Sequence, residues 1–152
     1  MSEILTLEKL EGYIGREIGL SDWMKITQER INAFAECTED RQWIHVDPEK
    51  AKHGPYGTTI AHGFLILSLL VHLTSHIELF QKGIRMVTNI GLDKVRFLSP
   101  VPVDSRICNR TVLKKVFEKG NGKIFITLES TIEIEGKEKP AMVAEVRALL
   151  MV

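Results

Sequence analysis

The chain has 152 residues, of which 44% are hydrophobic and 26% are charged, an ordinary composition for a globular protein. This length predicts a single domain over residues 1–152, with enough apolar side chains to bury a core without disulfides or metal. Lysine plus arginine balances aspartate plus glutamate at 20 each, so no net charge attracts nucleic acid or an anionic membrane. We therefore expect neither among its partners.

Three features predict a cytoplasmic protein. Residues 1–12 are charged and lack the apolar core of a secretory signal. Cys37 and Cys108 form neither a CxxC pair nor a disulfide framework, which is typical of reduced thiols inside the cell. The most apolar run, residues 64–73, has only about ten residues and is too short to span a bilayer.

The first half of the chain is predicted to be helical. Residues 27–37 carry apolar side chains at helical spacing, and Thr27 is suited to cap that helix. Asp47 and Pro48 then predict the cap and first position of a short helix. Residues 60–80 contain no proline and predict one long helix, apolar on most faces near its start.

The second half of the chain is predicted to form strands. Within residues 123–135, isoleucine and leucine share one parity and most polar side chains the other, which indicates a half-buried antiparallel strand. The pair Asn121-Gly122 before it is a strong hairpin signal. The remaining strands are expected at residues 17–26, 86–97, 104–119 and 141–151.

One apolar helix and several long antiparallel strands predict an α+β fold. The apolar face of the sheet must be buried against another element, and the long apolar helix is the candidate for that contact. A curved antiparallel sheet wrapped around a long central helix is the architecture called a hot-dog fold. Edge strands of such a sheet can pair with a second copy, so we expect a homodimer.

The stretch TEDRQWIHVDPEKA, residues 38–51, places an acid, an amide and an imidazole close together. Asp40 and His45 are expected in irregular chain between helices, where side chains can converge on a ligand. Together they can bind one water, with one group taking its proton while the other supplies one. Burial beside the apolar helix would raise the pKa of Asp40 toward neutrality. Gln42 can hold either group, or the water, through its amide.

The same three residues also fit a capped, solvated turn in which His45 fills a polar gap, and the pattern alone leaves both interpretations open. The sequence IAHG places Gly63 at or near the start of the long helix. Its N–H would have no acceptor within the helix and could stabilise a carbonyl oxygen that gains negative charge. Gly63 equally fits close packing of the helix on the sheet. We interpret His62 as structural.

The run DRQWIHVDPEKA followed by IAHG resembles the MaoC-like dehydratases, also called hydratase type 2. The resemblance covers most of the chain and looks closest to the branch of nodulation protein N-like proteins. Asp40, His45 and Ala51 match the family pattern in type and spacing. Gln42 replaces the usual Asn, and Trp43 replaces the usual Pro.

The resemblance implies reversible addition of water to a trans-2-enoyl-CoA thioester, giving an (R)-3-hydroxyacyl product without a cofactor. It implies that Asp40 and His45 are catalytic and that the N–H of Gly63 polarises the thioester carbonyl, which makes C3 electrophilic. No Rossmann glycine pattern or P-loop indicates NAD or ATP. The residues expected to bind the acyl-CoA substrate are Gln42, Trp43, Phe64, Arg96 and Phe97.

Two other functions fit the same pattern. A hot-dog acyl-CoA thioesterase would direct the activated water to C1, although the D-x-(N/Q)-x-x-H spacing favours the hydratase. A non-catalytic acyl-thioester-binding subunit would have lost activity through the changes at Gln42 and Trp43. A metal site is not indicated, because His72 and His76 have helical zinc spacing but lack the intervening glutamate of HExxH.

Overall fold

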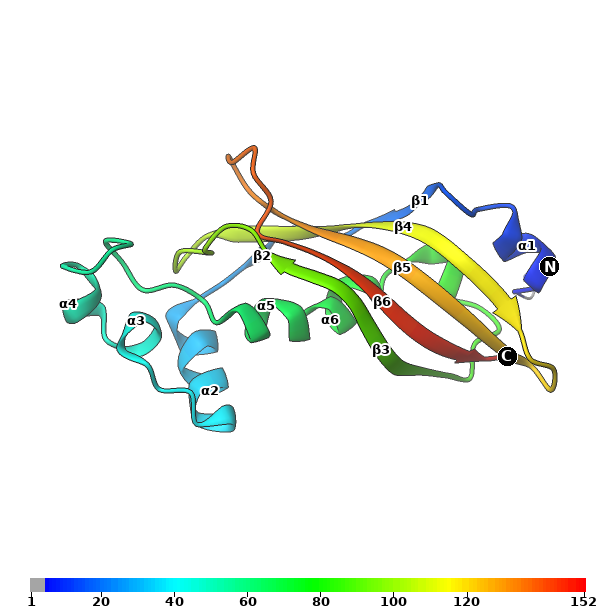
Figure 1. Ribbon diagram of the computed structural model, residues 1–152, viewed down its shortest axis with the longest axis horizontal. Helices are drawn as coiled ribbons and strands as arrows, with labels where there is room; N and C mark the ends of the chain where they lie inside the picture. Colours follow the sequence, from blue (N-terminus) through cyan, green and yellow to red (C-terminus); the bar gives the residue numbers. More distant parts are fainter. Residues whose placement is uncertain (1–4) are drawn as a thin grey trace.

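The computed structural model describes residues 5–152, so the first four residues of the charged N-terminal stretch lie outside the described part. In that part six antiparallel strands form one sheet (Figure 1). The strands are β1 (Glu17–Leu20), β2 (Met24–Lys25), β3 (Met86–Phe97), β4 (Arg106–Glu118), β5 (Lys123–Ile134) and β6 (Met142–Met151). Their order in the sheet is β1-β4-β5-β6-β3, and β2 pairs with β4.

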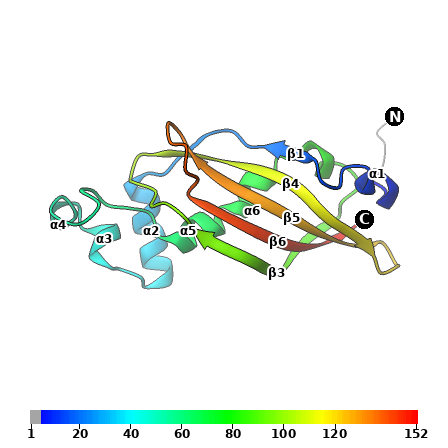
Figure 2. The ribbon, with the colours of Figure 1, turned by 45° about the horizontal axis from the view of Figure 1, so that its top comes forward.

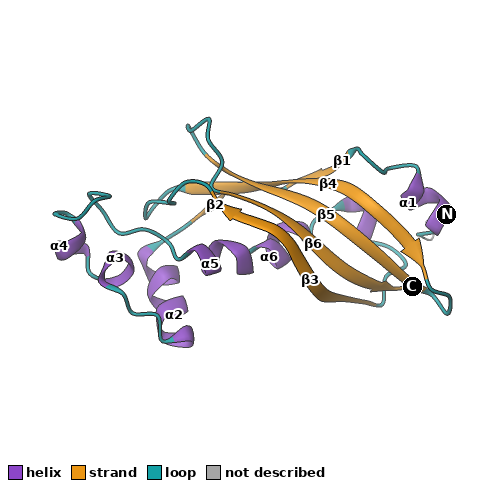
Figure 3. Ribbon diagram, in the orientation of Figure 1, coloured by secondary structure: helices purple, strands orange, loops and turns teal. Residues whose placement is uncertain are grey.

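The helices are short. Both predicted N-caps are confirmed, because Thr27 accepts from the N–H of Arg30 and Asp47 accepts from the N–H of Lys50. None of the helices in residues 5–152 is long and apolar enough to cross a membrane. The helices are α1 (Leu7–Glu11), α2 (Gln28–Thr38), α3 (Trp43–Val46), α4 (Pro48–Ala51), α5 (Gly63–Ser68), α6 (Leu70–Thr74) and the 3-10 turn η1 (Glu78–Phe80). Of these, α5 and α6 lie under the sheet, α2, α3 and α4 lie beyond one of its ends, and α1 lies near the opposite end (Figure 3).

The prediction of one continuous helix over residues 60–80 is wrong at both ends. The helix starts at Gly63, is interrupted for one residue between α5 and α6, and ends at Thr74. Its start is delayed because Ile60 forms a bridge with Pro102, which holds the preceding segment extended. Helical periodicity continues through such a segment in the sequence, but its backbone hydrogen bonds go to another part of the chain.

The strand predicted over residues 17–26 is divided into β1 and β2. The interruption follows β1 at Ser21, whose N–H donates to the carbonyl of Asn109 while its hydroxyl accepts from the N–H of Asn109. A side-chain hydroxyl thus replaces one backbone group of the ladder, and the regular pairing ends there. The other four predicted strands form close to their expected ranges.

The predicted hairpin at Asn121-Gly122 is confirmed and joins β4 to β5. Gly120, Asn121 and Gly122 all have positive φ, at 81°, 55° and 69°. Glycine and asparagine adopt this left-handed region more readily than other residues, so the local sequence specifies the turn. The alternation in β5 is also confirmed, since every second residue from Ile124 to Ile134 is buried.

The apolar face of the sheet covers α5 and α6, as the turned view in Figure 2 shows. Leu65, Ile66 and Leu70 from these helices join one buried cluster with Ile107 and Ile132 from the sheet. Burying such side chains is the main favourable contribution to folding. The predicted α+β hot-dog fold is therefore confirmed, with a shorter central helix than expected. Beyond the end of α5 lie α2, α3 and α4 (Figure 1). His45 lies on α3, and Asp40 lies between α2 and α3.

Candidate active site

His45 lies on the one-turn helix α3 rather than in the irregular chain that the sequence predicts. Its backbone carbonyl accepts a hydrogen bond from Gln28 at 2.8 Å, and the same Gln28 side chain accepts one from Thr59. The N–H of Ile60 donates to the carbonyl of Ile44 at 3.0 Å. These bonds fix α3 between α2 and the extended segment that leads to α5.

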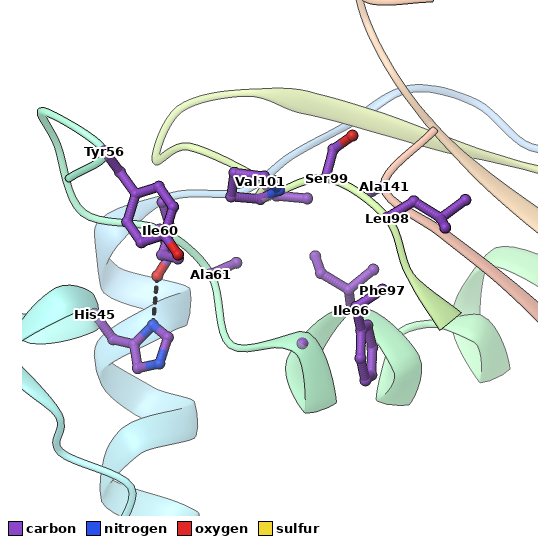
Figure 4. Close-up of a pocket in the computed structure, with 12 residues that line it drawn as sticks. His45, Tyr56, Ile60, Ala61, Ile66, Phe97, Leu98, Ser99, Val101 and Ala141 are labelled. Carbon is purple, nitrogen blue, oxygen red and sulfur yellow. Dashed lines mark hydrogen bonds between the residues drawn. The ribbon is translucent and has the colours of Figure 1, made fainter. Parts of the chain in front are cut away.

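The imidazole of His45 is held in one tautomer. Its Nδ1 lies 2.7 Å from the carbonyl oxygen of Ile60 (Figure 4). Because a carbonyl oxygen can only accept, Nδ1 must carry the proton, and the neutral ring keeps its lone pair on Nε2. The side chain is only 7% exposed, and this burial lowers the pKa of His45 below its ordinary 6.5. A neutral imidazole with a free Nε2 is suited to take a proton.

Asp40 follows α2 and is exposed, so the burial of its carboxylate expected from the sequence is wrong. The neighbouring Arg41 makes two hydrogen bonds to Glu36, at 2.8 and 3.1 Å, which close the turn after α2. The Asp40 carboxylate and one ring nitrogen each of His45 and His62 lie within 4.8 Å of one another. The acid and the imidazole singled out in the sequence therefore meet.

A pocket of about 340 Å³ lies between His45 and the start of α5 (Figure 4). Gly63 lines it as the first residue of α5, where its N–H has no acceptor within the helix. The pocket thus joins a proton acceptor to a backbone donor that can polarise a carbonyl. The other lining residues are Tyr56, Ile60, Ala61, Ile66, Phe97, Leu98, Ser99, Pro100, Val101 and Ala141.

A second cavity, of about 730 Å³, lies between the helices α5 and α6 and the sheet. Its lining includes Leu70, Val87 and Leu92 and, among the described residues, no ionisable side chain. By volume alone, this cavity would be the better candidate for a substrate site. The smaller pocket is the better candidate for chemistry, because acid–base catalysis requires an ionisable group within hydrogen-bond reach of the reacting atoms.

Of the five residues predicted to bind substrate, Phe97 lines the pocket, and its ring lies against the backbone of Gly63. A Cβ atom on that glycine would lie 3.1 Å from the ring. Phe64 is 67% exposed and meets Phe97 edge to face, with ring centroids 6.1 Å apart. Arg96 is exposed and outside the pocket lining. The structure therefore brings only Phe97 of these three to the pocket wall.

Gln42 and Trp43, the two departures from the family pattern, also lie outside the pocket lining. Gln42 is exposed and is the N-cap residue of α3. The Trp43 ring packs on Gly54, where a Cβ atom would lie 2.8 Å from it, and the ammonium of Lys50 lies 4.8 Å from its centroid. Trp43 thus packs α3 against α4. Substrate contacts of both residues remain predictions.

The structure adds His62, which the sequence marks only by its position before Gly63. It is 2% exposed, and its ring stacks on that of His45 with centroids 3.8 Å apart and planes at 25°. Its Nε2 lies 2.9 Å from the carbonyl oxygen of Asp40. His62 is outside the pocket lining, whereas Tyr56 and Ser99 line the pocket and carry no sequence signal of their own.

Asp40, His45 and His62 offer three possible metal ligands. The lone pair of an imidazole nitrogen lies in the plane of its ring, so two nearly parallel rings do not direct their lone pairs to a common point. The Nε2 of His62 also carries a proton, because it donates to a carbonyl. The arrangement fits proton transfer better than metal coordination, which requires deprotonated, convergent ligand atoms.

The MaoC like domain matches residues 9–135 of this chain. The chain is 53% identical over 131 residues to 3-hydroxyacyl-thioester dehydratase Z of Mycobacterium tuberculosis, covering 86% of each protein. It is 43% identical over 141 residues to nodulation protein N of Rhizobium leguminosarum bv. viciae, covering 92% of this chain and 88% of that protein.

Two solved structures share the fold over nearly the whole chain. The monoamine oxidase regulatory protein from Archaeoglobus fulgius matches with a TM-score of 0.78 and 25% identity, over 91% of each chain. The (R)-hydratase from A. caviae matches with a TM-score of 0.72 and 24% identity, over 89% of this chain and 94% of that one. The resemblance seen in the sequence is confirmed: the chain belongs to the MaoC-like dehydratase family.

Proposed function

We propose that this protein catalyses the reversible hydration of trans-2-enoyl-CoA thioesters to (R)-3-hydroxyacyl-CoA. One observation carries the proposal: the His45 imidazole and the N-terminal residue of α5, Gly63, line the same pocket. The Asp40 carboxylate lies beside that imidazole. The relative named 3-hydroxyacyl-thioester dehydratase Z and the structural match to an (R)-hydratase support the same reaction class.

The proposed site activates the substrate at its thioester. The carbonyl oxygen accepts a hydrogen bond from the N–H of Gly63, which stabilises the negative charge that develops on it. Conjugation passes this polarisation to C3, which becomes electrophilic. The apolar side chains of Ile66, Leu98 and Val101 provide a wall suited to the acyl chain.

Water is activated on the other side of the pocket. In the proposed mechanism, Nε2 of His45 takes a proton from a water that the Asp40 carboxylate orients. The water oxygen bonds to C3, the π electrons move to C2, and the His45 imidazolium returns the proton to C2. Oxygen and proton are then added to the same face of the double bond, because one imidazole performs both transfers. The reverse steps give dehydration.

The assay that tests this proposal mixes the protein with crotonyl-CoA and follows enoyl absorbance and free thiol together. Loss of absorbance without thiol supports hydration, and chiral analysis of the product tests the (R) configuration. Thiol release would instead assign the protein as a thioesterase. Saturable binding with neither signal would leave a non-catalytic acyl-thioester-binding subunit.

We also propose that the protein is a homodimer that pairs along β3, an edge strand of the sheet. Met86, Val87, Ile90 and Leu92 on this strand are each more than 40% exposed, at 46%, 55%, 43% and 45%. An exposed edge of this length with apolar side chains favours pairing with another strand. A second copy of β3 would cover these side chains and extend the sheet.

A further inference from the structure

His62 contacts two parts of the proposed active site and adjoins the third in the sequence. It directly precedes Gly63 as the N-cap residue of α5. Its ring stacks on the ring of His45 at 3.8 Å between centroids. Its Nε2–H donates to the backbone carbonyl of Asp40 at 2.9 Å. These three parts come from separate elements, so their relative placement depends on contacts of this kind.

The two ring nitrogens of His62 have different surroundings. Nε2 has the Asp40 carbonyl, whereas the buried Nδ1 has no hydrogen-bond partner among the described residues. Leaving a buried acceptor unpaired reduces stability. A phenyl ring would fill the same space, pack on Phe34 and His45, and avoid that loss. The observed contact that an imidazole makes here and a phenyl ring could not is the bond from Nε2–H to the Asp40 carbonyl.

We propose that His62 is a positioning residue, which uses the proton on its Nε2 to hold Asp40 and His45 in register with the Gly63 N–H. The kinetic effect expected of this role rests on the proposed hydratase function. Its hydrogen bond fixes the backbone of Asp40, and its ring face fixes the plane of His45. Neither contact involves substrate, so His62 acts through its neighbours.

The kinetic test compares His62→Phe, which keeps a ring but removes the donor, with His62→Gln, whose amide N–H reaches a similar position. His53→Phe is the matched control, because His53 is exposed and outside the pocket lining. We expect His62→Phe to reduce kcat for crotonyl-CoA about 100-fold, since small displacements of catalytic groups have effects of this size. KM should change little. His62→Gln should recover part of the loss, and the control should match wild type.

A second readout does not depend on activity. Nitrogen NMR of the wild-type histidines should show His62 protonated on Nε2 and not on Nδ1. The charged or titratable groups that face His45 are His62, which lowers its pKa, and Asp40, which raises it. In His62→Phe the loss of the imidazole acts to raise the pKa of His45, whereas the more apolar ring and the displacement of Asp40 act to lower it, so this variant serves to assign the His62 signals by their absence. If His62→Phe does not fold, the kinetics of His62→Gln and the wild-type spectrum still test the role of His62.

Three results would overturn the assignment. Two of them are a folded His62→Phe variant with wild-type kcat and a wild-type His62 protonated on Nδ1 alone. A loss of kcat that follows a loss of Tm, and that His62→Gln does not relieve, would make the residue merely structural and also overturn it. If the wild-type protein does not hydrate crotonyl-CoA, the proposed function fails by itself, while the NMR measurements still test the geometry.

Discussion

The Nδ1 atom of His45 donates to the carbonyl oxygen of Ile60 at 2.7 Å, which leaves Nε2 as the acceptor of the ring. Ile60 precedes Gly63 by three positions, at the start of the extended segment that enters α5. The same short segment therefore sets the tautomer of the proposed base and the position of the proposed carbonyl donor.

Replacing His45 by Gln should reduce kcat/KM for crotonyl-CoA hydration by about 10²–10⁴-fold, the usual contribution of a general acid–base group. The amide can retain a donor toward Ile60 but cannot exchange a proton near neutral pH. His53→Gln, a change of the same kind at an exposed histidine, should leave the rate unchanged. Steady-state kinetics on both variants checks this prediction. If His45→Gln and His53→Gln were equally active, His45 would have no catalytic role.

The Asp40→Asn variant should lose at least about 100-fold in kcat, because the neutral amide orients the attacking water less well and stabilises the imidazolium less. The exposed Asp22, which lies between β1 and β2, offers the control variant Asp22→Asn. Both substitutions remove one negative charge from the surface. A similar loss in both would indicate a nonspecific charge effect, and no loss in Asp40→Asn would contradict the proposed role.

Gly63→Pro should remove the proposed carbonyl donor without breaking the helix. Proline is well tolerated at the first helical position, and His62 before it already has φ −60° and ψ 138°, which suit a residue preceding proline. Gly63→Ala is the control, because it meets Phe97 in the same way but keeps the N–H. We expect kcat of the proline variant to fall about 10²–10³-fold below that of the alanine variant.

Acidification should lower both activity and stability through His45. Burial holds its pKa below the ordinary 6.5, so between these two pKa values the unfolded chain binds more protons than the folded one. The free energy of unfolding should therefore fall as the pH drops below about 6.5 and level off below the folded pKa. Thermal melts of wild type and His45→Gln across this range test it. The wild type should lose more stability, and parallel curves would refute the linkage.

Ile90→Lys should convert the proposed dimer into a monomer, because Ile90 is 43% exposed on β3 and outside the lining of the second cavity, and a charged side chain there would be buried against the second copy. The control is Leu20→Lys on β1, since Leu20 is 54% exposed on a different strand. Size-exclusion chromatography with light scattering measures the mass, which should fall to 17.2 kDa only for Ile90→Lys. A wild-type protein that is already monomeric would contradict the pairing along β3.

Features that depend on residues a few positions apart could be predicted from the sequence. The caps at Thr27 and Asp47, the turn at Asn121-Gly122 and the alternation in β5 all follow from local backbone preferences and side-chain periodicity. These features were enough to predict the fold class. The close spacing of Asp40 and His45 likewise indicated a candidate site, since both lie on one short stretch of chain.

The residues that complete this site could not be predicted from the sequence, because they depend on long-range contacts. Pairing with Pro102 keeps Ile60 out of the helix, so Gly63 becomes the first helical residue. His62 reaches Asp40 across 22 positions of sequence, a contact that no local pattern specifies. Such contacts arise when separate elements pack on a common core, because packing fixes distances between residues whose own sequence neighbourhoods carry no information about each other.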